Sequence, residues 1–119
     1  MATSNKNQIY GQIIINNNEP NFNGDEILYI SIRDSLRHEI DCIELGSKVI
    51  HLSKGQSMPI KFQCLYDPTK ACMKFEEIKT IPGGITLAAT IERNETILYI
   101  NNTNISLGEN INIPLVKND

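Results

Sequence analysis

Apolar and polar residues alternate along several stretches of this chain. The alternation is clearest in residues 58–66, 85–92 and 111–115. Because successive side chains of a β-strand point to opposite faces, each stretch presents one apolar face to a core. These three stretches therefore predict half-buried strands.

Other stretches predict strands with a different character. Residues 27–32 and 97–100 are apolar on both faces, which is typical of central strands covered by a second sheet. Residues 9–15 predict a further strand, in which Gly11 indicates a bulge. Residues 40–45 and 49–52 predict two weaker strands.

Turn-forming residues separate the stretches at short intervals. Gly46-Ser47 predicts a tight turn between the two weaker strands, and Asn94-Glu95 predicts a hairpin tip. Pro114 places the last strand at a sheet edge, because proline donates no hydrogen bond. This spacing predicts an all-β fold, an antiparallel β-sandwich of about seven strands. We expect one domain over residues 9–116, preceded by a disordered segment at residues 1–8.

One segment, residues 67–79, does not follow the strand pattern. Asp67 is suited to the N-cap of a helix and Pro68 to its first position. The segment predicts a short helix near residues 68–78, which ends before Pro82-Gly83-Gly84.

Composition and charge narrow the function. The chain of 119 residues has 14 acidic and 11 basic side chains, a formal net charge of −3, and no basic stripe. Nucleic-acid binding needs a positive field, so it is not expected. No stretch approaches the roughly 20 apolar residues of a membrane span. The polar start predicts no signal peptide and a cytoplasmic location, or a periplasmic or secreted one if the chain is a mature form with an added Met.

The candidate catalytic and metal-binding side chains do not form a recognisable set. His38 and His51 lie on separate weak strand segments, and no motif places Ser or Cys beside them. Asp25 and Glu26 are adjacent, so on a strand they point apart, and we expect them to solvate a strand entry. The sequence predicts no enzyme, no metal site and no cofactor.

Three cysteines, an odd number, do not suit a closed disulfide framework. Cys42 and Cys64 are expected to be small core residues, and a Cys64–Cys72 bridge is left open. Carbohydrate recognition is disfavoured, since there is no Trp and Tyr29 and Tyr99 are expected to pack in or against the core.

Four short motifs follow one another in the second half of the chain. They read, in order, MPIKF (58–62), YDPTK (66–70), ITLAATIE (85–92) and LYINNT (98–103). Together they resemble the YscW/YbaY-like group of bacterial lipoproteins, which includes the type III secretion pilot lipoprotein, over most of residues 9–115. The family's signal peptide and lipidated cysteine are missing, and residues 71–84 form a longer link than is usual there.

The resemblance implies a small β-sandwich that binds another polypeptide, which in the pilot members is the outer-membrane secretin. Asp67, Pro68, Asn101 and Thr103 match motif positions. We interpret them as structural, because Asp-Pro initiates turns and Asn and Thr side chains satisfy loop backbone groups.

The sequence thus favours a non-enzymatic, pilot- or chaperone-like module for a protein or peptide partner. Its first candidate contacts are Met73, Phe75 and Ile78, which are apolar in a polar stretch. These three side chains could instead close the open end of the sandwich. Two other functions stay open: a hydrolase inhibitor that presents Pro82-Gly83-Gly84 to a cleft, and a carrier of a small apolar ligand.

Overall fold

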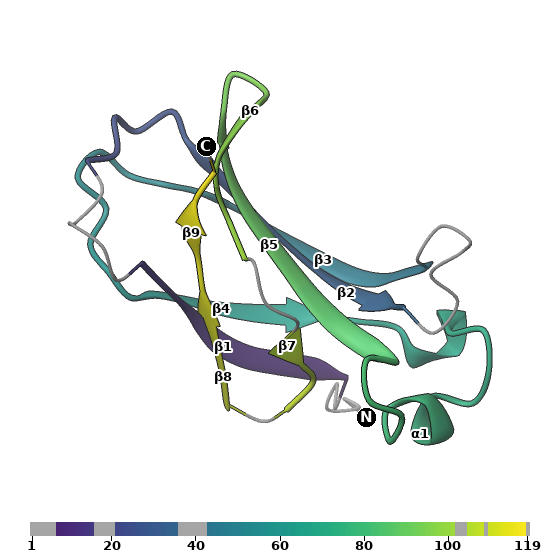
Figure 1. Cartoon of the computed structure of the whole chain (residues 1–119). Coiled ribbons are helices and arrows are strands. Elements are labelled where there is room, and N and C mark those ends of the chain that lie inside the picture. Colours follow the sequence, from purple (N-terminus) through teal and green to yellow (C-terminus); the bar gives the residue numbers. More distant parts are fainter. Residues whose placement is uncertain (1–6, 16–20, 36–42, 102–104, 109, 119) are drawn as a thin grey trace, which may run out of the picture.

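Two β-sheets pack face to face around one hydrophobic core in the computed structural model (Figure 1). The structure describes residues 7–15, 21–35, 43–101, 105–108 and 110–118. These residues form nine strands, of which β7 (Ile105–Ser106) and β9 (Val116–Lys117) have two residues each, so seven are longer. The predicted all-β sandwich of about seven strands is confirmed. The expected disordered segment lies mostly outside the described residues, and β1 begins at Gln8.

The smaller sheet has three strands in the order β4 (Ile60–Leu65), β1 (Gln8–Ile14) and β8 (Asn110–Pro114). β1 is antiparallel to β4 but parallel to β8, which departs from a purely antiparallel sandwich. Pro114 ends β8, which pairs only with β1 among the described strands, so the predicted sheet edge is confirmed.

The larger sheet is antiparallel throughout its described pairs. Its strand order is β3 (Ile43–His51), β2 (Ile27–Asp34), β5 (Ile85–Arg93), β6 (Thr96–Ile100) and β9, with β7 paired to β5. β2 lies between β3 and β5, as its apolar sequence predicts. The hairpin tip at Asn94-Glu95 is also confirmed, because both residues have positive φ, 50° and 67°.

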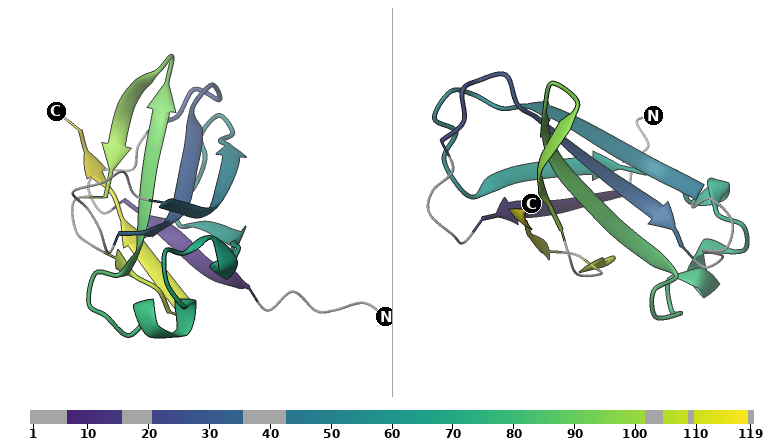
Figure 2. Two further views of the ribbon diagram at one scale, coloured as in Figure 1. Left: turned by 90° about the vertical axis from the view of Figure 1, so that its right-hand side faces the viewer. Right: turned by 45° about the horizontal axis from the view of Figure 1, so that its top comes forward.

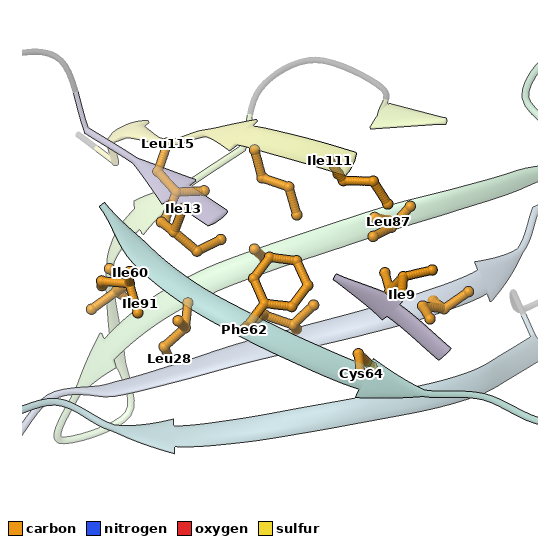
Figure 3. Packing of buried hydrophobic residues seen from close by; sticks show 14 of the residues in the cluster. Ile9, Ile13, Leu28, Ile60, Phe62, Cys64, Leu87, Ile91, Ile111 and Leu115 are labelled. Carbon is orange, nitrogen blue, oxygen red and sulfur yellow. The ribbon is translucent and has the colours of Figure 1, made fainter. Parts of the chain in front are cut away.

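The alternating apolar side chains of both sheets meet between them (Figure 3). Phe62 reaches into the centre of this core, above Gly11 of the neighbouring strand. A Cβ on Gly11 would lie 2.6 Å from the carbonyl oxygen of Ile111 and 2.7 Å from the Phe62 ring. The bulge predicted at Gly11 is wrong, since the register runs through it unbroken; the glycine provides space for Phe62.

The two weak strands predicted around Gly46-Ser47 are one continuous strand, β3, so the predicted turn is wrong. Leu45 is the extra residue of a β-bulge, because Ile32 of β2 pairs with Gly46 and Arg33 with Glu44. A Cβ on Gly46 would overlap the carbonyl oxygen of Leu65 and lie 2.7 Å from the Tyr66 Cα. The glycine allows β4 to approach β3 closely. In the sequence alone, a glycine with this role looks the same as one that forms a turn. Residues 40–42 of the prediction lie outside the described residues.

The segment after β4 holds two short helical pieces in place of one helix, a 3₁₀ turn at Pro68–Lys70 and helix α1 at Phe75–Ile78. The Asp67 carboxylate accepts a hydrogen bond from the Thr69 N–H (2.9 Å), and Pro68 begins the 3₁₀ turn, as expected from the capping pattern. Neither helical piece in the described part of the chain is long and apolar enough to cross a membrane.

Candidate functional site

The sandwich is closed along one side by the chain itself. After β8 the chain crosses from the smaller sheet to the larger one, where β9 pairs with β6. The N–H of Leu115 donates to the Ile14 carbonyl (2.8 Å), and the N–H of Asn118 donates to the Leu98 carbonyl (2.9 Å). This crossing links the two sheets along what we call the closed side.

The opposite side is formed by two sheet edges. β3 ends the larger sheet and β4 ends the smaller sheet, and neither pairs with another strand among the described residues. In the left view of Figure 2 these two teal strands lie on one side of the molecule and the yellow strands β8 and β9 on the other. We call this face, made of β3 and β4, the open side. It has a groove of about 290 Å³ lined by Ser47, Lys48, Gln63 and Leu65.

One end of the open side is fixed by the segment that follows β4. The N–H of Asp67 donates to the carbonyl of the bulged Leu45 (2.8 Å). Asp34, buried at the end of β2, accepts a hydrogen bond from the Cys72 N–H (2.8 Å). These contacts hold residues 67–72 against strands β2 and β3 of the larger sheet.

The other end is fixed by the loop before β2. The N–H of Leu52 donates to the Glu26 carbonyl (3.0 Å), and the N–H of Gly55 donates to the Phe22 carbonyl (2.9 Å). The connection from β3 to β4 is therefore tied to residues 22–26. Both ends of the open side are held by hydrogen bonds from loops and not by strand pairing.

Glu26 organises that second loop. Its buried carboxylate accepts hydrogen bonds from the N–H groups of Asn23 (2.9 Å) and Gly24 (3.0 Å) and pairs with the Arg93 guanidinium. Burial alone would raise the pKa of Glu26, but the hydrogen bonds from Asn23, Arg93 and Gly24 outweigh it and lower this pKa to about 2. The expectation that Asp25 and Glu26 both solvate a strand entry is wrong for Glu26, because the loop folds around its charge.

The two edges of the open side differ in how accessible they are to a further strand. In β3 the bulge at Leu45 interrupts the edge, and Lys48 pairs with the buried Ile30, so it lies on the core-facing side of the strand. Bulges and inward-pointing charges are devices that block strand addition. In β4 the residues alternate regularly between buried and exposed, with Lys61, Gln63 and Leu65 on the outer face. The regular edge, β4, is the better template for another strand.

The groove is lined by one cation, Lys48, and by the apolar Leu65, and Lys61 lies farther along β4 on the same face as Leu65. Lys48 and Lys61 form no ion pair within the described residues. Leu65 is apolar but lies on the outer face of β4, where it is 51% exposed. The alternation in the sequence already predicts that Lys61, Gln63 and Leu65 point outward, but not that β4 is an edge, and so the groove was missed.

The three predicted contact residues do not form one surface. Met73 is exposed, Phe75 is half-buried and stacks on Tyr66 with ring centroids 5.4 Å apart, and Ile78 is fully buried in the core. The position of Ile78 agrees with the alternative that this segment closes an end of the sandwich. Contact through Met73 stays a prediction. The Gly84 carbonyl accepts from the Ser35 N–H (2.7 Å), so the Pro82-Gly83-Gly84 turn is also held to the sheet.

The other motif residue that the structure describes, Asn101, has a structural position. Its side chain accepts a hydrogen bond from the Ala89 N–H (2.9 Å) and donates to the Leu87 carbonyl (3.3 Å), which extends the pairing along β5. Thr103 lies outside the described residues.

The structure describes two of the three cysteines and one of the two histidines. Cys64 is buried and Cys72 exposed, and both are free, so the Cys64–Cys72 bridge is not formed. Burial raises the pKa of the Cys64 thiol. His51 is exposed at the end of β3, whereas His38 and Cys42 lie outside the described residues. In the described part of the chain no three His, Cys, Asp or Glu side chains gather as a metal site would require.

Comparison with known proteins identifies a similar fold. No family model matches the sequence, and no curated protein matches it either. The solved structure of an alternative pilotin from the type II secretion system of Vibrio cholerae superposes with a TM-score of 0.73, over 94% of this chain and 96% of that one. The two sequences are 13% identical, so the similarity shows the fold alone. The chain therefore has a pilotin-like fold, without a match to the YscW/YbaY-like group itself.

Proposed function

We propose that this chain, with its pilotin-like fold, is a non-enzymatic, pilot-like protein that binds a polypeptide partner on the open side. The observation that carries the proposal is the regular edge of β4, which pairs only with β1 among the described strands. It lies beside a groove that is lined by Lys48, and Lys61 lies farther along the same strand. An extended segment of the partner adds to β4, where backbone hydrogen bonds supply affinity and the groove supplies specificity.

The charge of the groove indicates the chemistry of the partner segment. Lys48 and Lys61 have no acidic partner within the described residues, although the protein is acidic overall. A segment with carboxylates at the matching positions complements both cations, and such complementarity speeds association and selects among partners. The exposed Leu65 takes an apolar side chain of the same segment.

The class of partner follows from the two likenesses taken together. The fold neighbour belongs to a type II secretion system, and the sequence motifs resemble a pilot lipoprotein family of type III secretion. Both likenesses favour a polypeptide component of a secretion apparatus, such as a secretin. A partner of this kind is reached from the periplasm, so we propose the periplasmic location of the two that the sequence leaves open.

The proposal is tested by quantitative affinity capture from the source organism with matched variants. The double variant Lys48→Glu/Lys61→Glu reverses the charge of the open side. Lys70→Glu/Lys117→Glu makes the same change of charge elsewhere, on two exposed side chains. The expected result is one enriched polypeptide that the wild type and the second variant retain and the first loses at least about tenfold, since its new carboxylates face those of the partner and such like-charge contacts cost several kcal/mol. Equal recovery with both variants, at unchanged circular dichroism, would contradict binding on the open side.

A further inference from the structure

The outer face of the smaller sheet has a polar trough, which shares only Lys61 and Gln63 with the open side. Two rows of side chains run across the three strands in register, Gln63–Tyr10–Asn110 and Lys61–Gln12–Asn112. Between them the backbone of Phe62, Gly11 and Ile111 forms the floor. The hollow has a volume of about 360 Å³, within the range of small-ligand sites.

The trough is rich in amide groups that have no partner. Gln12, Asn110 and Asn112 make no side-chain hydrogen bond within the described residues. Each amide carries two N–H donors and a carbonyl acceptor, so the three together can bind groups that both donate and accept. No carboxylate lies in either row, which removes the ligands that a metal ion would need.

Tyr10 supplies an aromatic surface beside these amides. Its side chain is 51% exposed. Its hydroxyl accepts a hydrogen bond from the Gln8 side-chain amide (3.0 Å), and Gln8 in turn accepts one from Gln63. This chain of bonds holds the ring in place, so ordering it on binding costs little entropy.

The position of the trough discriminates between kinds of ligand. It crosses the sheet over β1, whose backbone pairs on both sides, so the backbone has no free groups for an added peptide strand. Recognition there must come from side-chain amides, one ring and one cation. Hydroxyl groups that donate and accept, together with an apolar C–H face for stacking, are the features of a saccharide.

We propose that this trough binds a short oligosaccharide, with Tyr10 stacking on one sugar ring and Gln12, Asn110 and Asn112 bonding its hydroxyl groups. Lys61 at the end of the second row favours a sugar with a carboxylate. The sequence-based expectation against carbohydrate binding considered Tyr29 and Tyr99, and neither residue lies here.

The test is an NMR titration of the ¹⁵N-labelled protein with cellotetraose, chitotetraose and tetragalacturonate. The expected result is saturable shifts confined to residues 10–12, 61–63 and 110–112, with a Kd of about 1 mM for the best tetrasaccharide. Tetragalacturonate binds more tightly than cellotetraose, and added salt reduces that difference.

Variants distinguish binding in the trough from unspecific binding elsewhere on the protein. Tyr10→Ala weakens binding about tenfold, as loss of a stacking ring should, and Gln12→Ala weakens it about threefold. Tyr29→Ala, on the outer face of the larger sheet, leaves binding unchanged. The proposal is overturned if none of the three tetrasaccharides shifts these signals at about ten times the expected Kd, or if Tyr10→Ala, still folded by its own spectrum, binds as the wild type does.

Discussion

The two sides of this sandwich hold their sheets together by different means. On the closed side a single stretch, residues 114–118, leaves one sheet and pairs in the other. On the open side β3 approaches β4 at Gly46, and the loops at the two ends are fixed by Asp67 and by residues 22–26. The edge strands of the closed side, β8 and β9, are therefore consecutive parts of one segment, whereas β3 and β4 on the open side are separated by the loop of residues 52–59.

An available edge is normally a liability, because unpaired backbone groups invite other chains. The protein blocks β3, with its bulge and the core-facing Lys48, and leaves β4 regular. This contrast is the reason for assigning the partner to β4.

The largest effect is expected on the closed side. Leu115→Ala removes a buried side chain at the crossing and leaves a cavity between the sheets. We expect a loss of about 3 kcal/mol in the free energy of unfolding, measured by urea denaturation. Val116→Ala, at the half-buried neighbour, should lose about 1 kcal/mol. Equal losses for the two variants would show that the crossing does not join the sheets through the core.

The next effect concerns the place where Gly46 of β3 packs against the end of β4. An alanine Cβ at position 46 would overlap backbone atoms of Leu65 and Tyr66, which can move only with their strand. Gly46→Ala should therefore reduce the free energy of unfolding by about 2 to 3 kcal/mol. Gly108→Ala meets no atom within 4 Å and serves as the control, with an expected change within about 0.5 kcal/mol. A neutral Gly46→Ala would mean that β3 and β4 are not closely packed there.

The stability that Glu26 contributes through the loop of residues 22–26 should depend on pH. The pKa of Glu26 is lowered from 4.5 to about 2 in the folded protein, so the unfolded state binds more protons between those values. Its stabilising contribution is complete above pH 4.5 and is lost as the pH falls through about 2. Glu26→Gln should cost about 1.5 to 2 kcal/mol at pH 7, since it removes charge-assisted hydrogen bonds.

The measurement is urea denaturation of wild type and Glu26→Gln at several values between pH 7 and pH 2. The difference in unfolding free energy between them should shrink toward the acid end. Asp25→Asn, at an exposed side chain, should stay within about 0.5 kcal/mol of the wild type at pH 7. A difference for Glu26→Gln that does not change with pH would contradict an ionised, hydrogen-bonded carboxylate.

The smallest effect on stability is expected at Lys48. Replacing it should instead increase the association of protein copies with one another. Lys48→Thr removes the core-facing charge of the β3 edge, so the unfolding free energy should change by no more than about 0.5 kcal/mol. Sedimentation velocity should nevertheless show more dimer and higher oligomer than in the wild type. Lys70→Thr, which lies outside the strands, should sediment as the wild type does. If Lys48→Thr sediments unchanged, the charge does not protect this edge.

The sequence allows the strands with a regular pattern to be predicted. Alternation located β4, β5 and β8, and the capping pattern of Asp67 and Pro68 located the 3₁₀ turn. It failed at Gly11 and Gly46, because a glycine that permits close approach looks the same in a sequence as one that forms a bulge or a turn.

The candidate site depends on properties that no local pattern records. Edge strands are defined by the pairing of distant segments, so the groove between Lys48 and Gln63 could not be predicted. The role of Glu26 was missed for the same reason, since its partner Arg93 is 67 residues away. The prediction of contacts at Met73, Phe75 and Ile78 rested on composition, which does not distinguish the buried Ile78 from the exposed Met73.

The most direct test of a partner strand on β4 is site-specific photo-crosslinking in cells of the source organism. Benzoylphenylalanine replaces either Gln63 on β4 or Lys117 on β9, both of which are exposed. Binding of a partner strand on β4 predicts that irradiation joins the variant at position 63 to one polypeptide. It also predicts that adding Lys48→Glu/Lys61→Glu abolishes this product and that position 117 gives none. A crosslink from position 117 and none from position 63 would contradict binding on the open side.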